Sequence, residues 1–511
     1  MPDGRQNQFR VAIVGGGMGG ATAAHFLREQ FGSQCSITLF EQSGRIGGRM
    51  RSATFAGRLV ETGASIFHSK NRYMYQFAND FGLTLGPLVK PDERFAFYDG
   101  SGKCAFSTFS GSRLSVFFRM LKRYGMDTLK VTWFLDAMVR DFSKIYQLQD
   151  KGHCFTTTAH LLSALRPDFV QMTTCSYDTW LTEKLKIGEN LKNELAYGLV
   201  SNNYCQDQTV HSFVGFISFV TILPKLLFVK DGNELVPANL VKQALSSNPT
   251  GAPKEFVHAQ VQSISPLSTG NRYALEYLES GQKGSKHEEF DYVVLAAPLH
   301  QDSNIEGRNS LTLPKFSYQP VDHSFFRGVL KQELLGLKPS VHKPEQELAI
   351  LPTKRAYLED KNCLFRSFIS FSSQDETMRR TWAVFSEPKR VSDPAHVFSE
   401  RYFQSASGGD VQSDPTNVKP LLAQWLAYPT YRPVTDPEKE LGQFVLAPRL
   451  YYANAIEHAA SCMEMAAIGG RNVALLIAAD RQTAEKLSKK EDEHAGLILV
   501  NKFPIPSTQR S

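Results

Sequence analysis

The sequence of 511 residues predicts an α/β protein whose first domain is built on a parallel sheet. Residues 11–14 form a short apolar run, which is typical of a buried parallel strand. A glycine-rich turn follows at once, then a helical stretch, and then a second apolar run over residues 37–40 that ends on Glu41. The glycines of the G-x-G-x-x-G motif in this turn are Gly15, Gly17 and Gly20. This order of elements is that of a Rossmann-type βαβ unit.

Each glycine of the motif has a separate task in binding a pyrophosphate. Gly15 permits the tight turn out of the strand, Gly17 lets the backbone approach the phosphates, and Gly20 lets the helix pack on the strand. Backbone N–H groups and the positive end of the helix dipole then face the phosphates. Glu41 can accept hydrogen bonds from the ribose hydroxyls of adenosine. The sequence therefore predicts that the protein holds a dinucleotide.

Residues 45–52 favour FAD over NAD as that dinucleotide. They have the pattern R-x-G-G-R-x-x-S, in which Gly48 can bring a main-chain amide close to a ligand. Arg49 can place a delocalised cation beside a phosphate, whereas we expect Arg51 to lie in a solvated loop. The pattern resembles that of the flavin-containing amine oxidase and desaturase superfamily.

The composition argues against several other classes of protein. The net charge is only +6 and no run of five like charges occurs, so nothing further supports nucleic-acid binding. None of the seven cysteines forms C-x-x-C or lies at zinc-ligand spacing from a histidine. The thirteen histidines form neither H-x-x-x-H nor H-E-x-x-H. We therefore expect no metal site and no disulfide scaffold.

The later elements predict two domains, the first of them discontinuous. Helical signals dominate the stretch before about residue 205, strand signals return near residue 256, and an Ala-rich helix follows residue 450. We expect an active site between the domains. The predicted division is an FAD-binding domain over 9–112, 206–304 and 441–485, a mixed α+β substrate domain over 113–205 and 305–440, and a C-terminal tail over 486–511.

Further motifs are E-T-G-A-S-I-F-H at 61–68, N-Y-C-Q at 203–206, D-G-N-E-L-V at 231–236, A-A-P-L-H at 296–300 and the block at 452–465. They resemble motifs of the prenylcysteine oxidase family, whose members are flavoprotein thioether oxidases. The similarity extends from about residue 10 to about residue 480. Asp231 and Cys205 stand where the family usually has glycine.

The resemblance implies a reaction in the degradation of prenylated proteins. A hydride would pass from the prenyl carbon next to sulfur to FAD, and water would add to that carbon. Free cysteine and a prenyl aldehyde would leave, and O₂ would become hydrogen peroxide. The family implies a lysosomal location. The chain shows neither a signal peptide nor an N-x-S/T acceptor, so a cytosolic form and a truncated gene model remain alternatives.

Several residues are candidates for the site. Residues 213–223 could form an apolar slot for the prenyl chain or a buried core strand. His68 could line the flavin face, as a tentative catalytic residue, or be a core histidine. Glu457 could bind the ribityl or pyrophosphate end of FAD or cap a helix. The tentative substrate contacts within the apolar run are Phe213, Phe216 and Phe219.

Residues 114–148 mix aromatic and basic side chains. This pattern predicts either contact with a membrane surface or an internal amphipathic helix pair. Two other functions stay open at this point, namely another flavin oxidase or desaturase acting on an amine or isoprenoid, and a non-enzymatic escort protein for prenylated GTPases. The intact Glu41 and R-x-G-G-R pattern argue against the escort protein. The sequence gives no oligomeric state.

Overall fold

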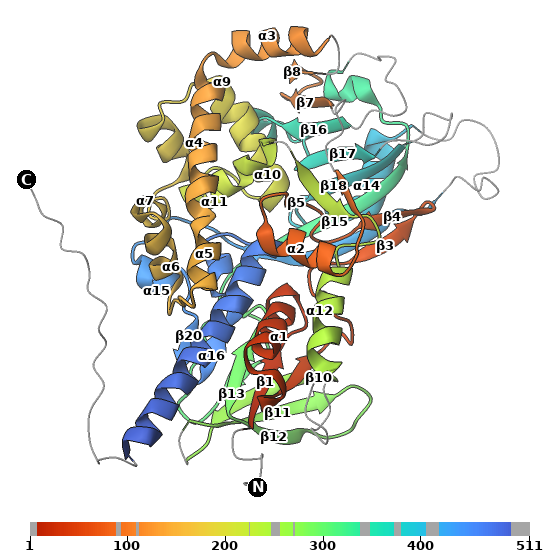
Figure 1. Cartoon of the computed structure of the whole chain (residues 1–511). Coiled ribbons are helices and arrows are strands. Elements are labelled where there is room, and N and C mark those ends of the chain that lie inside the picture. Colours follow the sequence, from red (N-terminus) through yellow and green to blue (C-terminus); the bar gives the residue numbers. More distant parts are fainter. Residues whose placement is uncertain are drawn as a thin grey trace, which may run out of the picture.

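The computed structural model describes residues 8–87, 94–108, 112–223, 225–246, 256–268, 271–337, 348–371, 380–404 and 418–491 (Figure 1). The predicted α/β class is confirmed, because β1 (Phe9–Val14), α1 (Met18–Phe31) and β2 (Cys35–Glu41) form the expected βαβ unit. All seven residues of β2 are buried. Strands that are covered on both faces need such continuous apolar runs.

The first large sheet has the strand order β12-β11-β10-β2-β1-β13-β21-β20. The strands from β10 to β21 in this order are parallel, and α12 (Leu235–Ser246) and α16 (Met463–Glu491) pack against α1. The sheet therefore joins segments far apart in the sequence around one core (Figure 1). The further strands are β10 (Phe256–Pro266), β11 (Tyr273–Glu279), β12 (Lys286–Phe290), β13 (Tyr292–Leu295), β20 (Val445–Ala447) and β21 (Leu450–Tyr452), with β14 (Glu306–Gly307) beside β10.

The second large sheet has the order β19-β15-β18-β17-β16-β7-β8. Its strands are β7 (Arg94–Tyr98), β8 (Cys104–Ser107), β15 (Tyr318–Gly328), β16 (Leu348–Pro352), β17 (Ser367–Phe371), β18 (Arg380–Ser386) and β19 (Leu421–Pro429). The predicted division put residues 94–107 with the FAD-binding domain, whereas β7 pairs with β16 and buries Ala96 and Phe97. An alternating pattern identifies a strand but not its distant partner, which explains the difference.

The other elements connect or cover these sheets. Two small sheets consist of β3 (Ser52–Phe55) with β4 (Arg58–Glu61), and of β5 (Phe67–His68), β9 (Leu226–Val229) and β6 (Leu85–Pro87). The remaining helices are α2 (Arg72–Asp80), α3 (Arg113–Tyr124), α4 (Asp127–Phe142), α5 (Lys144–Asp150), α6 (Thr158–Leu165), α7 (Pro167–Gln171), α8 (Tyr177–Thr179), α9 (Glu189–Leu191), α10 (Tyr197–Tyr204), α11 (Ser212–Phe219), α13 (Lys354–Glu359), α14 (Pro394–Tyr402) and α15 (Pro437–Glu440).

Two local expectations differ from the structure. The apolar run that begins at Phe213 forms helix α11 and not a core strand, because a short apolar run does not reveal its period. The His211 side chain caps this helix by accepting a hydrogen bond of 3.3 Å from the N–H of Val214. Helix α16 continues to Glu491, into the tail expected over 486–511, and residues 492–511 lie outside the described part. No described helix is both long and apolar enough to cross a membrane.

Candidate active site

The three motif glycines occupy different environments in the structure. A Cβ on Gly15, where φ is +113°, would lie 2.8 Å from the backbone of Ala296, and one on Gly20 would lie 2.0 Å from the carbonyl oxygen of Gly15. The fold itself therefore requires glycine at these two positions. A Cβ on Gly17 would meet only the Cα of Gly48, at 3.8 Å. The open space beside Gly17 fits a pyrophosphate that approaches the start of α1.

Glu41 lies at the carboxyl end of β2 and is buried. Its Oε2 accepts a hydrogen bond of 2.8 Å from the N–H of Gly16, and its Oε1 accepts bonds from the N–H and hydroxyl of Ser43 at 2.8 and 2.7 Å. The carboxylate is thereby fixed beside the glycine-rich turn. Two carboxylate oxygens offer about four acceptor positions, so capacity remains for a ribose hydroxyl.

The R-x-G-G-R segment folds back onto the same turn. The N–H of Gly47 donates to the carbonyl of Gly16 at 2.9 Å. The Arg45 guanidinium donates to the carbonyl of Gly48 at 2.7 Å and forms an ion pair with Glu234 at 3.2 Å. Arg45 therefore shapes the loop, and Gly48 closes one side of the space beside Gly17.

Arg49 and Glu457, which are 408 residues apart, form a partly buried ion pair. Arg49 donates to Glu457 Oε2 at 2.5 Å and to the carbonyl of Ala427 at 2.8 Å, and the hydroxyl of Tyr318 donates to Glu457 Oε1. Burial alone would lower the pKa of Arg49, but Glu457 outweighs that effect and raises it. Tyr318 carries no motif that could have identified it from the sequence. Glu457 lies in the 3₁₀ turn Ala453–His458, just before α16.

A cavity of about 1380 Å³ adjoins this region. Pockets for small ligands usually have volumes of about 300–1000 Å³, so this one has room for more than a single compact ligand. Its polar part includes residues of the segment 61–68, together with Tyr428 and Ser461. Its apolar part is formed by Phe95, Phe97, Met120, Leu195, Leu199, Ile217, Val220 and Ile222, among others.

The structure brings His68 to the cavity but not the three predicted phenylalanines. His68 is buried in the cavity wall, where its Nδ1 accepts a hydrogen bond of 3.1 Å from the N–H of Lys70. The three phenylalanines Phe213, Phe216 and Phe219 are almost fully buried in the core instead, and they do not line the cavity. Phe216, for example, packs with a ring-centroid distance of 4.6 Å against Phe134. The helical period of α11 turns Ile217 toward the cavity in their place.

Two buried carboxyl groups in the cavity wall have strongly shifted pKa values. Burial raises the pKa of Glu61 to about 7, and it raises the pKa of Glu464 to about 7 as well. Glu464 accepts hydrogen bonds from the N–H groups of Tyr73 and Met74 at the start of α2, at 2.8 and 2.9 Å. The Tyr146 hydroxyl donates to it at 2.8 Å. The sequence analysis assigned no role to either carboxyl group.

The two departures from the family pattern lie outside the cavity wall. Cys205 is buried in the left-handed conformation, with φ of 49°, and burial raises the pKa of its thiol to about 12. Asp231 is exposed in the turn before α12. The neighbouring Asn233, to which the sequence analysis gave no function, supports the cavity wall from behind, because its Nδ2 donates to the carbonyl of the wall residue Ala64 at 3.0 Å.

Comparison with solved structures shows the fold. Cyclohexylamine oxidase from Brevibacterium oxydans IH-35A superimposes with a TM-score of 0.57 at 14% identity, over 94% of this chain and 100% of that chain. Putrescine oxidase gives a TM-score of 0.55 at 14% identity, over 92% and 99%. A model of the NAD(P)-binding Rossmann-like domain matches residues 13–81. The likeness to these two structures shows the fold, and the Rossmann-like match covers the glycine-rich turn.

Comparison of sequences gives the family. The model of the prenylcysteine lyase family matches residues 109–491. Prenylcysteine oxidase 1 of Mus musculus is 31% identical over 487 residues, which are 91% of this chain and 88% of that protein. Prenylcysteine oxidase 1-like of Mus musculus is 27% identical over 498 residues, or 95% and 93%. The chain therefore belongs to the prenylcysteine lyase family, and the resemblance inferred from its motifs is confirmed.

Proposed function

We propose that the protein uses FAD to oxidise the thioether of farnesyl- or geranylgeranylcysteine. The observation that carries this proposal is the cavity, which continues from the polar segment 61–68 into an apolar part. A relative that shares 31% of its residues is named prenylcysteine oxidase 1. The products are free cysteine, a prenyl aldehyde and hydrogen peroxide, with O₂ as the electron acceptor.

The residues of this chain orient the substrate in the cavity for this reaction. When bound, FAD supplies the hydride acceptor and passes the electrons on to O₂. The sulfur lone pair of the substrate stabilises the positive charge that develops on the adjacent carbon, and water adds there before the carbon–sulfur bond breaks. The cavity wall holds the prenyl chain, so the main contribution of the wall is to orient the reacting carbon. His68 lies in the wall as a positioning residue, and hydride transfer itself needs no base.

The proposal assigns FAD to residues that the fold gathers from three parts of the chain. The open space beside Gly17 would take the pyrophosphate between Gly15 and Gly20, and Glu41 would hold the adenosine ribose. Gly48 would place an amide near the ligand. The Arg49–Glu457 pair would lie at the phosphate or ribityl end, because Arg49 retains N–H donors beyond the two it uses.

The proposal also includes where the reaction takes place and how the chain is divided into domains. Prenylcysteine is amphipathic, so we infer that the protein meets it at a membrane surface. The family supports a lysosomal location. We keep the division into an FAD-binding and a substrate domain as a proposal, with β7 and β8 assigned to the second sheet.

The test begins with the flavin spectrum of the purified protein, followed by assays under air with farnesylcysteine and with benzylamine. We expect a yellow protein that turns over farnesylcysteine faster and releases hydrogen peroxide. Equal or faster turnover of benzylamine would favour the amine oxidase alternative. A protein that stays colourless with added FAD would favour the escort alternative.

A further inference from the structure

Helices α3 and α4 display an apolar surface to solvent. Half of the strongly exposed large hydrophobic side chains among the described residues lie within residues 114–133. Phe117, Phe118 and Trp133 are 57%, 58% and 67% exposed. The α3–α4 apolar surface, as we define it, consists of Leu114, Phe117, Phe118, Leu121, Met126, Leu129 and Trp133. So concentrated an exposed apolar area usually marks an interaction site.

The spacing of these residues puts them on one side of each helix. In α3, Leu114, Phe117, Phe118 and Leu121 follow the pattern i, i+3, i+4, i+7, which forms a single stripe. The other side of α3 turns inward, where Tyr124 is buried and Met120 reaches the cavity. Figure 1 shows α3 across the top of the molecule, with α4 running down from it. The stripe therefore faces away from the body of the protein.

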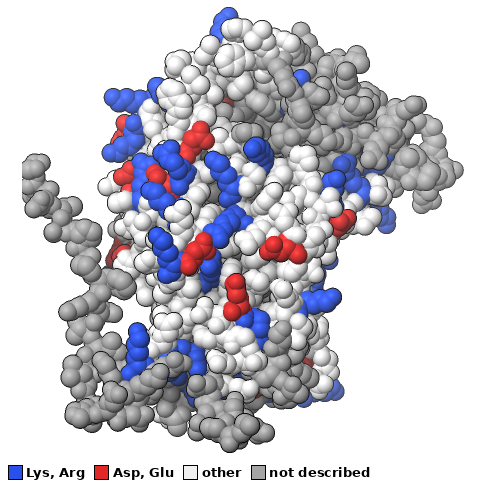
Figure 2. All heavy atoms as spheres, in the orientation of Figure 1, with Lys and Arg blue, Asp and Glu red and all other residues white. Residues whose placement is uncertain are grey.

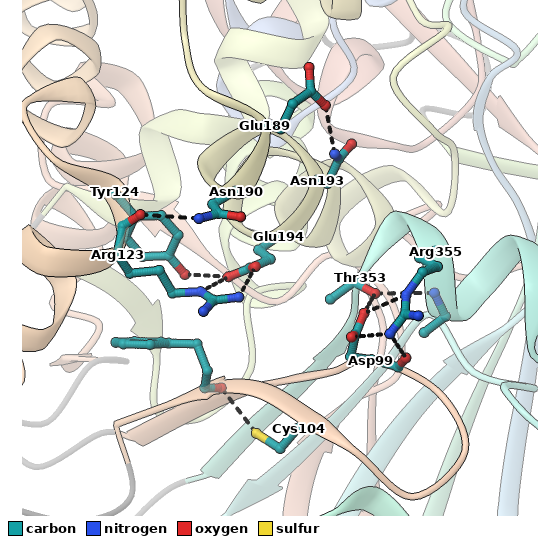
Figure 3. A network of polar contacts seen from close by, with 12 residues as sticks. Asp99, Cys104, Arg123, Tyr124, Glu189, Asn190, Asn193, Glu194, Thr353 and Arg355 are labelled. Atoms are coloured by element: carbon teal, nitrogen blue, oxygen red, sulfur yellow. Dashed lines mark hydrogen bonds and ion pairs between the residues drawn. The ribbon is translucent and has the colours of Figure 1, made fainter.

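An ion pair fixes the orientation of α3 (Figure 3). Arg123, in the last turn of α3, donates from Nε to Oε2 of the buried Glu194 at 2.7 Å, and the hydroxyl of Tyr124 donates to the same oxygen at 2.9 Å. At the other end, the Ser112 side chain caps the helix by accepting from the N–H of Ser115 at 3.3 Å. The apolar stripe thus belongs to a helix that is anchored at both ends.

The charge of α3 complements an anionic surface. Between residues 113 and 124 the sequence contains no Asp or Glu, and Arg119 and Lys122 add positive charge, whereas Arg123 is paired with Glu194 and Lys130 with Asp127. In Figure 2 the described part of the upper edge is mostly uncharged, with a few basic side chains. Aromatic side chains flanked by Lys and Arg are typical of helices that lie in the interface of an anionic membrane.

The same two helices form part of the cavity wall. Met120 of α3 and Thr128, Thr132 and Val139 of α4 line the cavity, whereas Phe117, Phe118 and Trp133 do not. We propose that the α3–α4 apolar surface inserts into the interfacial layer of an anionic membrane, and that the lipid substrate reaches the cavity alongside these helices. The docking rests on the surface alone, and the route of the substrate rests on the proposed function.

The test uses the FAD-loaded full chain and vesicles of equimolar phosphatidylcholine and phosphatidylserine. We expect the wild type to co-sediment with them at low salt and to be released as salt rises. Phe117→Ser combined with Phe118→Ser should weaken partitioning about tenfold or more, since two half-exposed aromatic rings no longer enter the bilayer. Leu358→Ser is the matched control, because Leu358 is 63% exposed on α13 and should not change binding.

Turnover separates the two parts of the proposal. The double variant should lose rate on farnesylcysteine embedded in vesicles and keep the wild-type rate on a short-chain, water-soluble prenylcysteine. A wild-type protein that does not bind the vesicles but oxidises the soluble substrate would overturn the proposed membrane docking and leave the proposed function intact. Wild type that binds vesicles but oxidises neither thioether would overturn the proposed function and the substrate route. A double variant that changes the oligomeric state and not vesicle binding would show that a second copy covers this surface.

Discussion

Gly17→Val should empty the FAD site while the fold persists. Gly17 has φ of −75°, which valine adopts, and its Cβ would meet only Gly48 Cα at 3.8 Å, so we expect a change in unfolding free energy of about 1 kcal/mol or less. The side chain would fill the space kept for the pyrophosphate. Losing two hydrogen bonds to a charged phosphate costs about 3–6 kcal/mol. This corresponds to a rise of roughly 10²–10⁴-fold in the Kd for FAD.

The assay is the flavin absorbance of the purified variant, followed by titration of the apoprotein with FAD and by urea denaturation. Gly188→Val is the control, because Gly188 also precedes a helix, with φ of −68°, but lies away from the turn; its Cβ would lie 3.1 Å from the Asp127 carboxylate, which is the end of a flexible side chain. Gly20→Ala should behave differently from both, since its Cβ would lie 2.0 Å from the Gly15 carbonyl oxygen and the fold itself should suffer. A folded Gly17→Val protein with wild-type affinity for FAD would refute our assignment of the pyrophosphate site.

Three further predictions concern the core, a buried acid and the chemical step. Phe216→Ala should lower the unfolding free energy, measured by urea denaturation, by about 3–5 kcal/mol. Ile217→Ala should mainly raise KM for farnesylcysteine, because Ile217 lines the cavity. Similar KM values for the two variants would contradict this assignment of Phe216 to the core and Ile217 to the cavity. Burial raises the pKa of Glu464 in the folded state to about 7, above its ordinary value of 4.5. The folded state therefore binds the proton more tightly than the unfolded state. The stability that this proton contributes is fully present below pH 4.5 and is lost as the pH rises through 7. Glu464→Gln should therefore gain stability relative to wild type as the pH rises from 4.5 to 7, by up to about 3 kcal/mol, with the exposed Glu359→Gln as the control substitution. His68→Ala should retain substantial activity. Deuterium at the prenyl C1 of the substrate should slow flavin reduction. A His68→Ala variant that is inactive but binds FAD and substrate normally would reveal a general base.

The sequence by itself determined the dinucleotide unit and the family. The glycine spacing, the apolar strands and Glu41 act within about thirty residues of one another, where backbone geometry leaves few alternatives. The motifs after residue 60 extended the resemblance over nearly the whole chain. Local patterns of this kind are readable because each one is fixed by its immediate neighbours.

The tertiary structure decided which side chains meet. The pairing of Arg49 with Glu457 and Tyr318 joins positions hundreds of residues apart, and no local pattern encodes it. The apolar run from Phe213 has no evident period in the sequence, so only the packed helix α11 shows that Phe216 belongs to the core and Ile217 to the cavity. The sequence alone could not decide whether residues 114–148 form an internal helix pair or expose an apolar stripe on α3. The exposure of these side chains depends on which parts of the rest of the chain pack over them.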